Sequence, residues 1–190
     1  VGFLFFANKE ELISFLDNVK IEYPKYKNQN LNNFLKKNNI KNVNNEFYFA
    51  PDLIKKIYSC KGQEIATHTF SHFYTLEPGA KTNDFVTDLD LALKIAKKNN
   101  IQINSIVFPR NQYSDDILKA CKNLNLKSFR GNLNSYIFKP SSNQSAFKRL
   151  IRLANSYFNI SAPLLNEFDR NSSLLNICLL YTSPSPRDNT

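Results

Sequence analysis

The feature that most constrains the fold is a regular alternation of short apolar segments and amphipathic segments in the middle of the chain. Residues 63–67, 101–108 and 126–129 have the length and composition of buried strands. Between them, the spacing of apolar residues predicts helices over residues 82–99 and 115–124. Consecutive parallel strands need a crossover connection, which is usually a helix. The sequence therefore predicts an α/β fold with parallel strands and helical crossovers.

The predicted helix over residues 82–99 has charges that suit the helix dipole. Thr82 or Asn83 can cap its N-terminus. Acidic residues occur in its first turns and lysines in its last turn, an arrangement that complements the dipole. We therefore interpret the acidic residues as helix electrostatics rather than as metal ligands. They are Asp84, Asp88 and Asp90.

The part of the chain before residue 51 is less regular. Residues 1–6 predict a core strand, and residues 9–19 predict an amphipathic helix. Residues 22–50 contain an Asn-rich stretch that we interpret as an insertion. A short helix is predicted within it over residues 31–38.

A further helix is predicted from Asp52, its expected N-cap, to Cys60. Its apolar residues Leu53, Ile54 and Ile57 are expected to face inward. Ser114 is the corresponding N-cap for the helix over residues 115–124. Cysteines are widely spaced and form no CxxC motif, so we expect Cys60 and Cys121 to be buried free thiols.

The ends of the sequence indicate a fragment. Met is absent, and the chain begins within an apolar stretch, so we interpret Val1 as an internal point of a longer protein. Residues 178–190 resemble translated sequencing-adapter read-through, and we interpret them as a non-native tail. Residues 1–177 are accordingly expected to form one partial domain, with a last helix between residues 145 and 157.

Charge and hydropathy limit the classes of partner that we expect for this chain. The net charge of +9 comes from 25 basic and 16 acidic residues. Because the lysines are scattered among asparagines, with no Arg-rich helix or aromatic-basic RNA motif, we expect no nucleic-acid partner. The longest apolar run, residues 1–7, is far shorter than the roughly 20 residues of a membrane helix, so no membrane segment is expected.

The two histidines of the chain, His68 and His72, follow the predicted strand over residues 63–67. On a helix their spacing would place both imidazoles on one face, where they can bind one divalent cation. A bare HxxxH motif is more often a capping or core-edge pair, but the preceding strand and the hydroxyl residues Thr69 and Ser71 favour a metal site. Thr69 also argues against a zinc protease, which needs a glutamate at that position.

Residues 64–72, Glu-Ile-Ala-Thr-His-Thr-Phe-Ser-His, resemble the second motif of the polysaccharide deacetylases, carbohydrate esterases with a NodB-homology domain. In that family an H-[ST]-x-x-H segment after a strand supplies two metal ligands. The resemblance therefore implies that His68 and His72 bind a divalent cation, with Zn²⁺ as the first choice. It also implies a distorted (β/α) barrel, of which this chain would form a part, and an N-acetylated polysaccharide as substrate.

Residues 108–112, Phe-Pro-Arg-Asn-Gln, resemble the third motif of that family, which lines the active-site groove. The family usually has an arginine two positions before the proline, where this chain has Val107. Arg110 could therefore either steady the catalytic base or form an ordinary surface salt bridge. The groove residues that we expect are Pro109, Arg110, Asn111 and Arg130.

The resemblance implies hydrolysis of an N-acetyl group, in which a metal-activated water attacks the acetamide carbonyl and an aspartate takes its proton. The family draws its two aspartates from a motif upstream of Val1 and its acid histidine from a motif near the C-terminus. Neither is present, so no catalytic residue is assigned here. We expect a deacetylase fragment that is inactive as given and binds metal weakly. The alternatives are a deacetylase-like domain that binds carbohydrate without hydrolysis, and a domain whose histidines are purely structural.

Overall fold

The computed structural model describes residues 2–19, 24–28, 40–131 and 173–177, with a few positions between 147 and 154 and the backbone of 167–169. The helix expected over residues 31–38 and the tail at 178–190 lie outside these residues. Most of the helix expected between residues 145 and 157 lies outside them as well.

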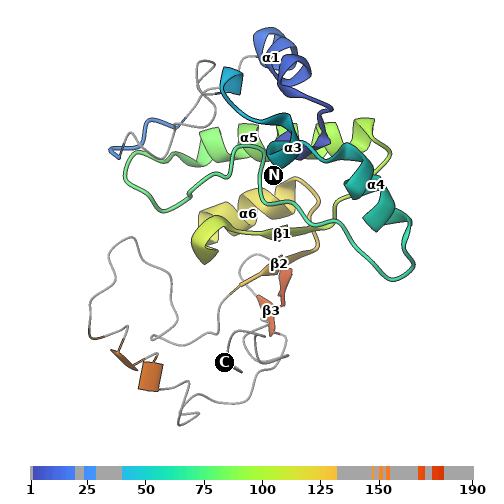
Figure 1. Ribbon diagram of the computed structural model, residues 1–190. Coiled ribbons are helices and arrows are strands. Elements are labelled where there is room, and N and C mark those ends of the chain that lie inside the picture. Colours follow the sequence, from blue (N-terminus) through green and yellow to red (C-terminus); the bar gives the residue numbers. More distant parts are fainter. Residues whose placement is uncertain are drawn as a thin grey trace.

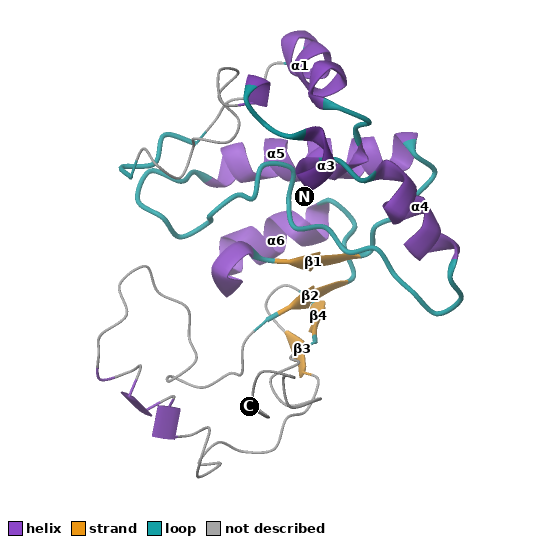
Figure 2. Cartoon of the chain, viewed as in Figure 1, coloured by secondary structure: helices purple, strands orange, loops and turns teal. Residues whose placement is uncertain are grey.

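A small, mostly parallel sheet forms one layer of the structure (Figure 2). The strands β1 (Ser105–Val107), β2 (Ser128–Arg130) and β4 (Leu174–Asn176) are parallel neighbours, and β3 (Glu167–Asp169) pairs antiparallel with β4. Thr67 extends the sheet beyond β1 through a parallel bridge to Ile106. The α/β class with parallel strands is thus confirmed, whereas the described strands do not show a barrel.

The expected strands are shorter than the sequence predicts. Residues 63–67 contribute one bridge, in which Thr67 N donates to Ser105 O (3.0 Å) and Thr67 O accepts from Val107 N (2.8 Å). The segment over residues 101–108 is a strand only within β1. Apolar residues outside these short strands are buried by packing against helices. An apolar run in the sequence predicts burial, but it does not show whether the segment pairs as a strand or packs against a helix.

The strand expected over residues 1–6 is wrong. Residues Gly2–Phe5 form a 3₁₀ helix, η1. Phe3 and Phe6, three positions apart, are both buried in the same cluster, and a 3₁₀ turn places such residues on one side, whereas a strand would point them to opposite faces. One backbone bond, from Gly2 N to Thr69 O (3.0 Å), ties η1 to the histidine segment.

Four expected helices are confirmed: α1 (Lys9–Asn18), α4 (Pro51–Ser59), α5 (Thr82–Lys98) and α6 (Asp115–Asn123). Ser114 caps α6 by accepting from Ile117 N, as expected. The N-cap of α5 is Lys81, which makes no side-chain cap bond, so neither Thr82 nor Asn83 has the predicted role. Among the described helices, none has the length and apolar character needed to cross a membrane.

Helix α5 lies between α1 and α6 (Figure 1) and contributes to two apolar clusters. Phe85 and Leu89 pack with α6 and the sheet, where Ile106 and Phe129 are also buried. Further along α5, Ile95 packs in the cluster formed with η1 and α1. This helix therefore holds the N-terminal elements and the sheet layer together.

The expectation for α4 (Pro51–Ser59) is wrong in two respects. Its N-cap is Ala50, so Asp52 lies inside the first turn. Leu53 and Ile57, expected to face inward, are 57% and 38% exposed. The reason is the position of the helix, which lies at the edge of the described structure beside α3 (Asn45–Tyr48) and contacts η1 (Figure 1).

The cysteines differ from each other. Cys121 is buried, as expected, and burial raises the pKa of its thiol to about 12. Cys60 is exposed, because it follows the exposed α4 rather than ending a buried helix. The prediction of a buried thiol is therefore confirmed for Cys121 and wrong for Cys60.

Candidate metal centre

Residues 68–72 form a non-helical loop directly after the Thr67 bridge. Thr69 (φ 63°) and His72 (φ 61°) are in the left-handed region, where a non-glycine residue costs roughly 1–3 kcal/mol. The expected helical placement of the HxxxH motif is therefore wrong. The loop is not helical because side chains accept the hydrogen bonds of its backbone N–H groups. Thr69 Oγ1, for example, accepts from Phe73 N at 2.7 Å, and such a bond gives the backbone an alternative to helical hydrogen bonds.

The loop nevertheless brings the two histidines together. The ring centroids of His68 and His72 are 4.6 Å apart, with an angle of 65° between the ring planes. Rings at this separation can direct one nitrogen each toward a shared cation. The proximity that the sequence predicts is thus present, although a left-handed turn produces it instead of a helix.

His68 is oriented by the sheet. Its Nδ1 lies 2.6 Å from the carbonyl oxygen of Val107, the last residue of β1. Because a carbonyl only accepts, Nδ1 carries the proton and Nε2 keeps the lone pair. A backbone carbonyl bound to the far ring nitrogen is the usual outer support of a metal-ligating histidine.

Both imidazoles favour the neutral form, which is the form that binds metals. Burial lowers the pKa of His68, and the Val107 carbonyl partly offsets this lowering. Burial also lowers the pKa of His72, with a further contribution from the charge of Arg110. The pair is therefore ready to act as a ligand at neutral pH without first losing protons.

The donor set fits a divalent cation as a pair of ligands. Neutral imidazoles suit Zn²⁺ and neighbouring transition metals better than Mg²⁺ or Ca²⁺. Among the residues that the structure describes, no group of three or more His, Cys, Asp or Glu side chains could hold a metal ion. In the described part of the chain, the candidate ligands of a cation are thus two ring nitrogens, one from His68 and one from His72.

Arg110 lies beside the pair in a salt bridge. Its Nη1 is 2.8 Å from Glu77 Oε1, and its guanidinium carbon is 4.5 Å from the centre of the Tyr74 ring. The Tyr74 ring in turn is 5.0 Å from the His72 ring. Of the two interpretations for Arg110, the structure shows the salt bridge. Glu77 also accepts from Gln112 Nε2 at 3.2 Å, which fixes the turn after β1.

The other expected groove residues are distributed around this turn. Pro109 is buried in it, and Asn111 follows with a positive φ of 51°. Arg130 is the exposed last residue of β2 and is in register with Val107, whose carbonyl holds His68. His68, Arg110 and Arg130 thus follow or end neighbouring parallel strands at the carboxyl side, where the sequence predicts them.

Sequence reasoning missed Asp88. This side chain of α5 is 4% exposed, and it accepts from Phe70 N (2.7 Å) and Ser71 N (3.1 Å) in the histidine loop. Burial raises the pKa of its carboxyl group, and the loop hydrogen bonds partly counteract the rise. Assigning Asp88 to helix electrostatics was therefore wrong. The available signal was its position, because Asp88 lies on the apolar side of its helix with Phe85 and Ala92.

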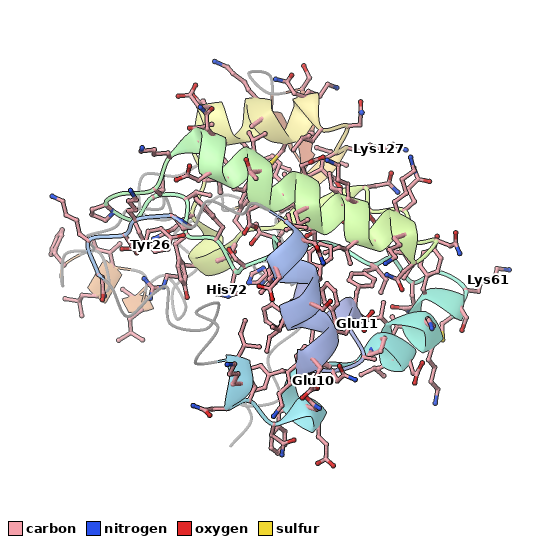
Figure 3. All side chains as sticks on the ribbon, turned by 90° about the horizontal axis from the view of Figure 1, so that it is seen from above. Glu10, Glu11, Tyr26, Lys61, His72 and Lys127 are labelled. Carbon is pink, nitrogen blue, oxygen red and sulfur yellow. The ribbon has the colours of Figure 1, made fainter. Side chains whose placement is uncertain are left out.

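Tyr26 was also missed, because it comes from the stretch interpreted as an irregular insertion. The side chain is 6% exposed, and its Oη accepts from Tyr74 N at 2.8 Å. Burial raises the pKa of the Tyr26 hydroxyl. Figure 3 shows Tyr26 and His72 on the same side of α5. At least this part of the insertion supports the site through Tyr74.

No protein-family model matches the chain, and neither a curated protein nor a solved structure matches it. Inference about function therefore depends on the geometry of the histidine loop and on the motif resemblance.

The lowered histidine pKa values predict how stability depends on pH. As the pH falls through the ordinary value of 6.5, the unfolded chain takes up protons on His68 and His72 before the folded protein does. The free energy of unfolding should therefore fall below pH 6.5, until the lower folded pKa values are passed. Urea unfolding at several pH values, compared with a His68→Gln/His72→Gln variant, measures this contribution. Asp88 has the opposite pH dependence but is common to both proteins, so an equal loss in both would contradict the prediction.

Proposed function

We propose that this chain is part of a metal-dependent polysaccharide deacetylase in which His68 and His72 are two ligands of a Zn²⁺ ion. The observation that carries the proposal is the pairing of the two rings at 4.6 Å, with His68 Nδ1 bound to a backbone carbonyl. The motif resemblance agrees with it. The position also agrees, since α/β enzymes place their sites beyond the carboxyl ends of parallel strands.

Part of the strand order agrees with the barrel that the family would have. Thr67, β1 and β2 are parallel neighbours in chain order, as successive strands of a (β/α) barrel are. Beyond β2 the order differs from that of a barrel, because β3 comes next in the chain, is not beside β2 and pairs antiparallel with β4. We propose that Thr67, β1 and β2 belong to a section of such a barrel, with the histidine loop on its active-site face.

The proposed site assigns a separate role to the histidines and to Arg110. His68 and His72 bind the ion through one ring nitrogen each, and the Val107 carbonyl fixes the His68 tautomer. When bound, zinc would lower the pKa of water and polarise an acetamide oxygen. Arg110, which contacts Tyr74 and Glu77, would place a positive charge near His72.

A calorimetric titration of the chain with Zn²⁺ tests the proposal, with Mg²⁺ as the matched hard cation. We expect one zinc per chain, a higher melting temperature with zinc, and no heat with Mg²⁺, because imidazole nitrogen prefers the softer ion. No heat and an unchanged melting temperature with zinc would support the purely structural role of the histidines. Acetate release does not distinguish the carbohydrate-binding alternative, because the fragment is expected to be inactive in either case. Binding of an N-acetylated oligosaccharide with equal affinity in the presence and absence of zinc would favour that alternative.

A further inference from the structure

Asp88 reaches the histidine loop from a separate element, α5, and bonds to it at several points. Its Oδ1 accepts from Phe70 N at 2.7 Å, and its Oδ2 accepts from Ser71 N at 3.1 Å. The hydroxyl groups of Thr69 and Ser71 also hydrogen-bond to the carboxylate. All three residues between the two histidines are thus held by one side chain.

The same side chain reaches both ends of the loop through Thr69. The Thr69 hydroxyl, bonded to Asp88, accepts from Phe73 N at 2.7 Å. Phe73 directly follows His72, and Thr69 directly follows His68. Between the two candidate ligands, Phe70 N and Ser71 N are therefore bound to Asp88, and just after His72 the Phe73 N–H is bound to Thr69.

A buried carboxylate is unfavourable unless its surroundings satisfy it. Here no described Lys, Arg or His side chain forms an ion pair with Asp88, and the loop donates its hydrogen bonds instead. An apolar residue at this position would fit the core but would leave Phe70 N and Ser71 N without acceptors. The left-handed conformations of Thr69 and His72 need such an external support to persist.

We propose that Asp88 is the positioning residue of the metal centre, which holds the Thr69–Ser71 backbone so that His68 and His72 face one cation. The metal in this inference rests on the proposed function, whereas the hydrogen bonds from the loop to Asp88 do not depend on it. Asp88 does not touch the cation. It acts through the loop, as an outer-shell partner does for a metal ligand.

The Asp88→Asn variant tests this role, because asparagine has the same shape but directs an N–H at a loop donor. We expect zinc affinity to fall by roughly 10–100-fold, as for the loss of an outer-shell partner. Asp90→Asn removes the same charge from the same helix, where Asp90 pairs with Lys94 at 2.6 Å, and should leave affinity unchanged. Leu89→Ala, at a buried apolar residue of the same helix that makes no hydrogen bond to the loop, is the control for a general loss of stability. A zinc affinity of Asp88→Asn equal to that of Leu89→Ala would overturn the proposal.

A second measurement tests the role of Asp88 in the absence of metal. In metal-free protein, Asp88→Asn should speed hydrogen exchange at the Phe70 and Ser71 amides and abolish the NMR contact between the His68 and His72 rings. If the wild type binds no zinc, the proposed function fails, and these two readouts alone decide whether Asp88 positions the pair. Unchanged exchange and an unchanged ring contact would overturn it. Should Asp88→Asn not fold, Ser71→Ala removes one bond to the carboxylate and should change both readouts in the same direction.

Discussion

Replacing His68 with alanine is expected to weaken Zn²⁺ binding by more than about 100-fold, since loss of an outer-shell partner alone costs roughly 10–100-fold. His72→Ala should have an effect of the same size, because the two rings lie 4.6 Å apart and serve one ion. Calorimetric titration of each variant measures the loss.

Arg130→Gln is the matched control for these variants. Arg130 is exposed at the end of β2. Burial is the main cause of the lowered pKa of His68, and the positive charge of Arg130 adds to it. Removing that charge beside a cation site should leave zinc affinity unchanged or slightly higher. Zinc affinity that is unchanged in His68→Ala or His72→Ala would show that the ion is held elsewhere.

Phe108→Ala is expected to lower the free energy of unfolding by about 3–5 kcal/mol, the range for a buried phenylalanine. Phe108 is 1% exposed, and its ring lies 5.5 Å from that of Tyr113 and 6.1 Å from that of Phe129. It directly follows β1, so the cavity would open beneath the turn that holds Arg110. Urea unfolding at pH 7 measures the change.

Phe47→Ala provides the comparison, because the Phe47 side chain is 78% exposed. The free energy of unfolding should change by no more than about 0.5 kcal/mol, as for most surface substitutions. Losses of similar size in the two variants would mean that the core does not lie where α5, α6 and the sheet place it.

The helices were predictable because their signals are local. The apolar spacing in α5 and the Ser114 cap of α6 are both readable within one or two turns of sequence. Strand lengths were less predictable, since an apolar run such as residues 101–108 records burial and does not say whether strand pairing or helix packing provides it. The same limit explains η1: residues 1–6 form an apolar run, and only the burial of both Phe3 and Phe6 in the structure distinguishes a 3₁₀ turn from a strand.

The site was predictable only where its residues are contiguous. The two histidines stand out because the motif is local, and their proximity follows from the loop. Their supports come from distant elements: Val107 from β1, Asp88 from α5 and, through Tyr74, Tyr26 from the long insertion. A carboxylate in an apolar helix stripe indicates a buried partner, but it does not say which loop provides the donors.

The most direct test of the central claim is a side-chain ¹⁵N NMR titration of the two imidazoles with Zn²⁺. The ¹⁵N resonances of His68 Nε2 and of one His72 ring nitrogen should shift together and saturate at one ion per chain. His68 Nδ1 should stay protonated and bound to Val107. A shift at one ring alone, or at neither, would contradict the shared metal site.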